Sequence, residues 1–258
     1  MAVSKNDLLN QHASAYVLEV MAEQLRQSGF RSKSDNLLRW YRLVGDNVVH
    51  TVYFCTSWPH FPIIMDIRGG FHPLFIAPDF SKNVYMPSGR RSRDAVSLCR
   101  PIMKDHNLAL YREDIAVTCP DDGDRGADLL AKIIKKLDWA RTPGDCYDLH
   151  KKDYMDIAAD LGLPAEAAFR NISVDFINEA IYHNDTEMYP YAVRFLQHQL
   201  ECQQRARQVR KLTKVETQQA QEYQQLLDVL LNEDQARYVE YLEQTAKKNL
   251  AKLKRIVT

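Results

Sequence analysis

Residues 48–78, VVHTVYFCTSWPHFPIIMDIRGGFHPLFIAP, are the stretch in which β-branched and aromatic residues alternate and turn residues interrupt them. Residues of these types are enriched in strands, and glycine and proline mark strand ends. From Ile63 onward, apolar and polar positions alternate up to Gly69, which is the pattern of a strand with one buried face. The stretch therefore predicts the centre of an antiparallel sheet.

The two glycines at residues 69–70 are expected to turn the chain inside this stretch. Two-residue hairpin turns of types I′ and II′ need positive φ angles, which glycine adopts without steric cost. With that turn, Arg68 would pair with Phe71, and Ile67 with His72, which would then lie in the core. The predicted core face comprises Ile63, Met65, Ile67, Leu74 and Ile76.

The fold class predicted from this pattern is α+β: an antiparallel sheet of about four to five strands packs with helices and precedes an all-helical C-terminal region. The expected strands are residues 37–44, 48–58, 61–68 and 71–77, with a further one within residues 108–118.

Helical periodicity predicts the remaining elements. An amphipathic helix is expected over residues 5–28, ended by Gly29, and another over residues 125–140. Ser173 should cap a later helix, and Thr213 with Glu216 forms a predicted capping box. We expect two regions, an α+β sheet domain at residues 1–141 and a helical region at residues 142–258 that ends in a long helical hairpin.

The composition of the chain indicates the cellular compartment more clearly than it indicates the function. The 34 basic and 34 acidic side chains balance, so affinity for polyanions would have to come from a local patch. The chain has five widely spaced cysteines and no C-x-x-C pair, which favours reduced thiols in the cytoplasm. We found no apolar stretch long enough to span a bilayer, so no membrane partner is expected.

The order of elements resembles a known group of domains. An opening helix precedes a Gly-Phe step with a basic turn at residues 29–33, and an aromatic strand, a meander and helices follow. This order is similar to that of uncharacterised bacterial domains of unknown function, over about the first 200 residues. The resemblance supports the fold, implies no activity and transfers no functional residue.

One candidate ligand site lies on the polar side of the predicted sheet. A carboxylate, a guanidinium and an imidazole near aromatic rings could bind a small anion, although a solvent-side ion pair explains the same residues. The candidates are Tyr53, Trp58, His60, Asp66 and Arg68. We found no catalytic triad, cofactor-binding motif or metal-ligand spacing, so no catalytic residue, cofactor or metal is predicted.

Clusters of basic residues form the second candidate site. They could contact phosphates, or they could be solvated helix faces and favourable charges near helix ends. The candidates are Arg90, Arg91, Arg93, Arg205, Arg207, Arg210, Lys211 and Lys214.

Three functions remain open at this stage. The leading hypothesis is a non-catalytic binding or regulatory module that contacts a protein partner, or a second copy, through its C-terminal helices. The alternatives are a nucleic-acid-associated protein that uses its basic helices and an enzyme that acts on a small anionic substrate. The apolar stripes of the last helices could be covered by each other, by the sheet or by a second copy.

Overall fold

The computed structural model describes residues 21–32, 39–57, 64–76, 115–116, 121–169 and 172–257. The chain forms two compact units. Unit 1 comprises Met1–Leu149 and Ala246–Thr258, and unit 2 comprises His150–Thr245.

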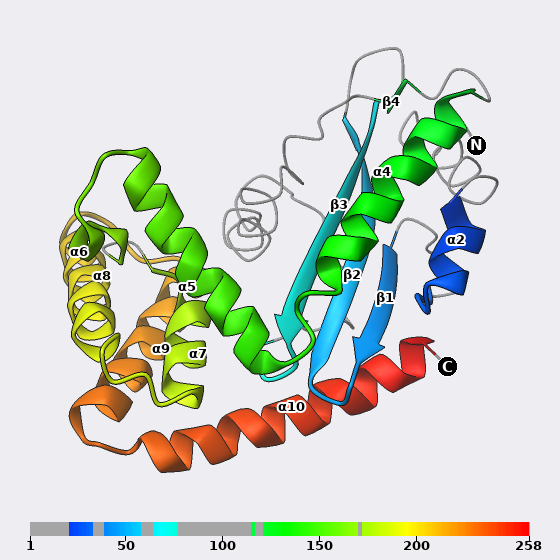
Figure 1. Cartoon of the computed structure of the whole chain (residues 1–258). Coiled ribbons are helices and arrows are strands. Elements are labelled where there is room, and N and C mark those ends of the chain that lie inside the picture. Colours follow the sequence, from blue (N-terminus) through cyan, green and yellow to red (C-terminus); the bar gives the residue numbers. More distant parts are fainter. Residues whose placement is uncertain are drawn as a thin grey trace, which may run out of the picture. The chain divides into compact units, whose positions relative to one another are not determined.

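Unit 1 contains an antiparallel sheet with the strand order β1-β2-β3-β4 (Figure 1). β1 (Arg39–Val44) and β2 (Val48–Ser57) form a hairpin around residues 45–47, in which Val44 pairs with Val48. β3 (Ile64–Pro73) pairs with β2, and the two residues of β4 (Ile115–Ala116) pair with the start of β3. Together with the surrounding helices, this sheet confirms an antiparallel α+β fold.

The predicted hairpin turn at Gly69 and Gly70 is wrong. Both glycines lie inside the continuous strand β3, where Gly69 pairs with Val52 and Gly70 with Thr51. Among the described residues, three strands therefore form the body of the sheet, fewer than the predicted four to five, and only the short β4 extends it.

Packing explains why a glycine occupies position 69 of this strand. A Cβ atom on Gly69 would lie 2.6 Å from Cγ2 of Ile133 and 3.5 Å from both Cδ atoms of Leu137. Both residues belong to helix α4 (Asp121–Leu137), which lies along the sheet (Figure 1). Glycine within a strand often marks such a close approach.

The revised register also changes the predicted pairs. His72 pairs with Val49 rather than with Ile67, although it is buried, as predicted. Leu74, which directly follows β3, is fully buried and Ile76 is half-buried, while the side chains of residues 63, 65 and 67 lie outside the described part of the structure.

Helix α2 (Ala22–Gln27) ends as the sequence predicts, at Gly29. Gly29 has a φ of +81°, its N–H donates to the Arg26 carbonyl, and the N–H of Phe30 donates to the Leu25 carbonyl. This pair of bonds is a Schellman motif, and the apolar contact that accompanies such a motif is available because Phe30 and Leu25 are both fully buried. The predicted part of this helix before residue 21 lies outside the described residues.

The end of helix α10 (Gln235–Val257) packs on the sheet within unit 1. Leu253 is fully buried and shares a core cluster with Val49 and Leu74. The Asn249 side chain donates a 2.7 Å hydrogen bond to the Leu74 carbonyl. The apolar stripe of the last helix could have packed against another helix, the sheet or a second copy of the chain. The sheet covers the final turns of this helix.

Unit 2 is helical in its described part. Its sequence range contains α6 (Ala165–Ala168), α7 (Val174–Tyr182), α8 (Tyr189–Val209) and α9 (Lys214–Leu231), while α5 (Pro143–Asp160) begins in the range of unit 1 and continues into that of unit 2. Ser173 accepts a hydrogen bond from the Phe176 N–H at the start of α7, and Thr213 and Glu216 form the capping box of α9, as predicted.

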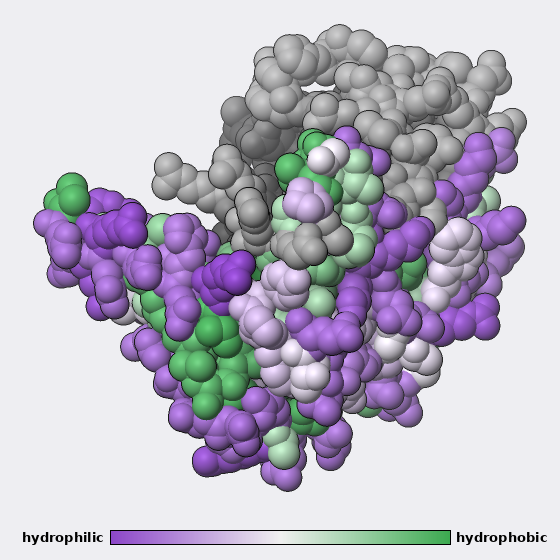
Figure 2. Space-filling view, turned by 60° about the vertical axis from the view of Figure 1, so that its left-hand side comes forward, coloured by the Kyte–Doolittle hydropathy of each residue, from purple (hydrophilic) through white to green (hydrophobic). Residues whose placement is uncertain are grey.

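The described surface in Figure 2 is mostly hydrophilic, with apolar side chains gathered in a few patches. Among the helices that the structure describes, none has both the length and the apolar composition needed to cross a bilayer.

Candidate functional site

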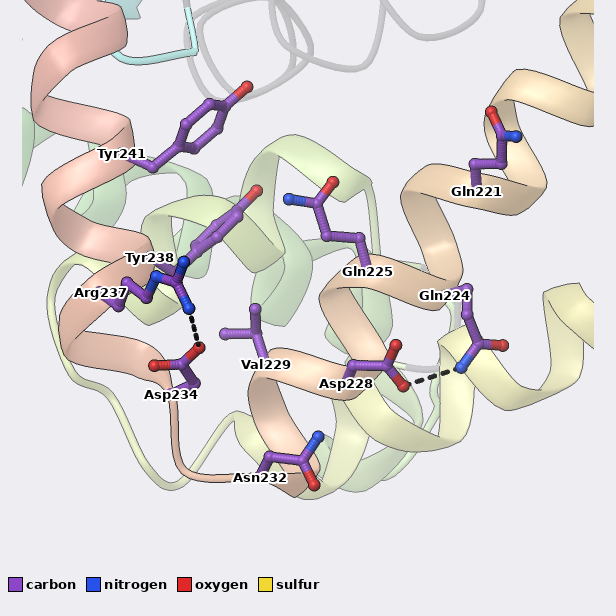
Figure 3. Close-up of a pocket in the computed structure, with 10 residues that line it drawn as sticks. All are labelled: Gln221, Gln224, Gln225, Asp228, Val229, Asn232, Asp234, Arg237, Tyr238 and Tyr241. Atoms are coloured by element: carbon purple, nitrogen blue, oxygen red, sulfur yellow. Dashed lines mark hydrogen bonds and ion pairs between the residues drawn. The ribbon is translucent and has the colours of Figure 1, made fainter.

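A polar groove of about 630 Å³ lies between α9 and the first turns of α10 in unit 2 (Figure 3). The chain reverses direction there through Glu233, whose φ is +54°, so that the end of α9 and the start of α10 diverge from one corner. Nine of the ten lining side chains are polar. The lining comprises Gln221, Gln224, Gln225, Asp228, Val229, Asn232, Asp234, Arg237, Tyr238 and Tyr241.

Two polar pairs line the rim of the groove. Gln224 donates a 2.9 Å hydrogen bond to Asp228 along α9, and Arg237 lies 3.9 Å from Asp234 at the start of α10. All four residues are exposed to solvent. These pairs are therefore weak, and a ligand that bonds to either carboxylate would compete mainly with water.

Two tyrosines form the aromatic part of the groove. The rings of Tyr238 and Tyr241 have their centroids 5.5 Å apart, and Tyr241 is 51% exposed. The Tyr238 hydroxyl donates a 3.0 Å hydrogen bond to Asn178 on α7, and burial raises the pKa of this hydroxyl above its usual value. Tyr238 is therefore a fixed, protonated side chain, whereas Tyr241 offers an open ring to a ligand.

The lining of the groove combines hydrogen-bonding, charged and aromatic side chains. It contains no histidine, cysteine, serine or lysine. Its reactive groups are therefore the carboxylates of the two aspartates and the phenol groups of the two tyrosines. It offers amide donors and acceptors, carboxylates, a guanidinium and an aromatic face, which are the groups that bind polar segments of protein.

The structure brings the predicted basic cluster of the C-terminal region together at the tip of the α8–α9 hairpin. Arg205 and Arg207 lie in the last turns of α8, Arg210 caps it, Lys211 is in the turn, and Lys214 opens α9. All five side chains are exposed.

Two of these five cations form ion pairs with acidic side chains. Arg210 forms hydrogen bonds of 2.5 and 2.9 Å with Glu216, which hold the pKa of the Glu216 carboxyl well below its usual range. Arg205 lies 3.4 Å from Glu201. The cationic tip available to a ligand is therefore formed chiefly by Arg207, Lys211 and Lys214.

The predicted ligand site on the sheet is described only through its backbone. Arg68 lies directly opposite Tyr53 in the β2–β3 register, and Asp66 lies opposite Cys55. Trp58 and His60 lie outside the described residues, as do Arg90, Arg91 and Arg93 of the other basic cluster. Binding at either place stays a prediction.

A buried hydrogen-bonded pair in unit 2 was missed by the sequence analysis. Nδ1 of His150 on α5 lies 2.5 Å from Oε2 of Glu179 on α7, and the two side chains are 4% and 0% exposed. Nearby, Lys151 forms a 2.6 Å ion pair with Asp185. A possible signal was Glu179 itself, which stands between the apolar residues of an amphipathic helix.

A second buried histidine joins strand and helix in unit 1. Nε2 of His50 lies 2.6 Å from the carbonyl of Ala140, which can only accept, so this nitrogen carries the proton. Nδ1 is then the acceptor for Arg42, 2.8 Å away, and Arg42 also pairs with Asp138. Burial, above all, lowers the pKa of His50 to about 4. His50 is therefore a neutral histidine that links β2 to the segment after α4 through its hydrogen bond to Ala140.

Comparison with known proteins adds no family to this description. No family model, no curated protein and no solved structure matches the chain. The described residues of a single chain also contain no group of three or more His, Cys, Asp or Glu side chains placed to hold a metal ion.

Proposed function

We propose that the protein is a non-catalytic interaction module that binds a polar segment of a partner protein in the α9–α10 groove. The observation that carries this proposal is the lining of the groove, which combines an exposed aromatic ring with amide, carboxylate and guanidinium groups. Tyrosine and arginine are enriched among the residues that contribute most to protein–protein affinity.

The side chains of the groove suit a peptide segment. A peptide backbone presents repeating N–H and C=O groups, which the glutamine and asparagine side chains of the lining can match. The rings of Tyr238 and Tyr241 and the side chain of Val229 supply apolar surface beside these polar groups.

The charge of the groove supports a basic rather than an acidic segment. Asp228 and Asp234 contribute two negative charges and Arg237 one positive charge, so the lining has a net charge of −1. A lysine or arginine of the partner could approach Asp228, which accepts a hydrogen bond from the neutral amide of Gln224. The cysteine pattern supports the cytoplasm as the compartment of this interaction.

The test begins with a photo-crosslinking amino acid at position 241 in the full-length chain, expressed in cells. The matched control places the same amino acid at Gln204, an exposed position on α8 of the same unit. Proteins captured only through position 241 are then purified, and their affinity is measured by calorimetry for the wild type, Tyr241→Ala and Asp228→Asn.

Tyr241→Ala should weaken binding by about 30-fold, corresponding to the roughly 2 kcal/mol of an interface hot spot. Asp228→Asn should weaken binding less and reduce its salt dependence, whereas Gln204→Ala should change neither. Equal capture at positions 241 and 204, or a purified partner whose affinity is indifferent to Tyr241→Ala, would reject the proposal.

A second candidate function, binding to nucleic acid, is favoured by the tip of the α8–α9 hairpin. Arg207, Lys211 and Lys214 are exposed there on two helices and the turn between them. Cations that contact phosphates release condensed counterions, so affinity falls with salt in proportion to the number of contacts.

Replacing Arg207, Lys211 and Lys214 together by glutamine should weaken binding to duplex DNA and lower the slope of log affinity against log salt by about 2.7, which is 0.9 for each of three lost contacts. The control removes the same charge from α10 through Lys247, Lys248 and Lys252. Equal effects of the two triple variants would show a general charge effect and remove the hairpin tip as a specific site.

A further inference from the structure

Helix α8 carries an exposed pair of metal-ligating side chains that no function above uses. His198 and Cys202 are one turn apart and both exposed, and the Cys202 sulfur lies 3.6 Å from Nε2 of His198. Tetrahedral zinc has Zn–N and Zn–S bonds of about 2.05 and 2.3 Å, which places two such ligand atoms about 3.6 Å apart. The pair already has the spacing of two zinc ligands.

The described part of a single chain supplies only half of such a site. Structural zinc needs four protein ligands, and the described residues contain no third His, Cys, Asp or Glu placed with this pair. Because both side chains are exposed, a second protein surface can reach them. Two identical pairs related by a twofold axis would give two imidazoles and two thiolates.

The pair lies on a seam of α8 that its own chain partly covers at the N-terminal end, where the Tyr191 ring lies 5.4 Å from the Phe169 ring and the Phe195 ring 6.3 Å from the Tyr223 ring. Positions 191, 195, 198, 202, 205 and 209 of α8 follow the alternating spacing of four and three residues that places side chains along one seam of a helix. Val209, at the end of this seam, is 86% exposed. The seam residues are Tyr191, Phe195, His198, Cys202, Arg205 and Val209.

We propose that His198 and Cys202 bind zinc together with the same two residues of a second copy of the chain, with the two α8 helices antiparallel. A twofold axis beside residue 200 places His198 next to Cys202 of the second copy. The same axis places Val209 next to Tyr191 of the second copy, which covers the exposed valine. This site is independent of the α9–α10 groove.

The test uses the full-length chain, freed of metal and kept under a phosphine reductant so that disulfide dimers cannot form. Co²⁺ is titrated while the thiolate-to-cobalt charge-transfer absorption is recorded, and molar mass is measured by light scattering with and without Zn²⁺. The expected results are one Co²⁺ for two chains and a shift from monomer to dimer on addition of Zn²⁺.

Cys202→Ser and His198→Gln should each lower Co²⁺ affinity by more than the roughly 10- to 100-fold that loss of an outer-shell partner costs, and both should abolish the dimer. Gln197→Ala, an exposed neighbour directed away from the seam, should leave both properties unchanged. A thiolate band that persists in Cys202→Ser, one metal per monomer, or no metal binding by the wild type would each overturn the proposal.

Discussion

Replacing Gly69 with alanine is expected to destabilise unit 1, because the added methyl group would lie 2.6 Å from Cγ2 of Ile133. Forcing an extra methyl group into a packed core costs about 1–3 kcal/mol. Alanine also lowers the entropy of the unfolded chain, which offsets about 0.4–1 kcal/mol of that cost where the backbone angles suit it. We therefore expect a net loss of about 1–2 kcal/mol in the free energy of unfolding.

Ile133→Ala provides the matched partner for this substitution. Ile133 is fully buried, so its truncation alone should cost about 2–5 kcal/mol. The truncation also removes Cγ2, the atom that the new methyl group would meet. Gly69→Ala should then be close to neutral in the Ile133→Ala background, which corresponds to a coupling energy within the range of about 0.5–3 kcal/mol for residues in contact.

Tryptophan fluorescence during urea unfolding is a suitable assay. All three tryptophans, Trp40, Trp58 and Trp139, lie in the sequence range of unit 1, so the signal reports that unit. Circular dichroism followed in the same titration shows whether unit 2 unfolds separately, in which case each transition is fitted by itself.

The hairpin turn and the continuous strand predict different stabilities for the double variant of Gly69→Ala and Ile133→Ala. If residues 69–70 formed a hairpin turn with positive φ angles, alanine would be strained whatever side chain stood at position 133. A loss that persists in the Ile133→Ala background would therefore refute the continuous strand. A Gly69→Ala variant as stable as the wild type would refute the close approach of α4.

Three further predictions concern buried polar groups. The pKa of His50 is about 4 in the folded protein and about 6.5 in the unfolded chain. Neutral His50 therefore contributes fully to the free energy of unfolding above pH 6.5, and about 3 kcal/mol of that free energy should be lost as the pH falls toward 4. Unfolding of unit 1 followed by fluorescence measures this loss, and a free energy of unfolding that stays constant over that pH range would contradict it. Asn249→Ala should cost unit 1 about 1–3 kcal/mol because the Leu74 carbonyl loses its buried donor; urea midpoints test this, and an unchanged midpoint would count against the contact. Glu179→Leu should cost about 1–3 kcal/mol by circular dichroism because it removes the carboxylate that is hydrogen-bonded to Nδ1 of His150, and adding His150→Leu should recover most of the loss; no recovery would show that the pair is not the cause.

The elements predicted correctly from sequence depend on residues close together in the chain. The turn before β2, the end of α2 at Gly29, and the caps at Ser173 and Thr213 are each defined within a few residues. In each case a side chain or a glycine allows backbone groups of neighbouring residues to form hydrogen bonds. The sequence pattern that predicts the turn or cap therefore spans only a few residues.

The errors came from glycines whose role depends on distant residues. A glycine pair in an apolar stretch is consistent with a turn and with a strand that another element approaches closely. Ile133 and Leu137, more than sixty positions further along the chain, decide between these alternatives at Gly69.

Some features of the candidate sites could also be predicted from sequence, and others depend on the tertiary structure. The basic residues at the α8–α9 tip could be recognised by spacing, since they lie within ten positions. Their pairing could not, because it depends on how Glu216 folds back to Arg210. The α9–α10 groove depends on the angle between two helices, which no local pattern encodes.

By itself, the sequence determined the antiparallel α+β class, the β1–β2 hairpin, and the start or end of several helices. Only the tertiary structure decided that β3 is continuous, that Leu253 packs beside Val49 and Leu74, and that His150 meets Glu179. The physical reason is that hydrogen bonds of turns and caps close over a few residues, whereas burial depends on which distant surfaces fit together.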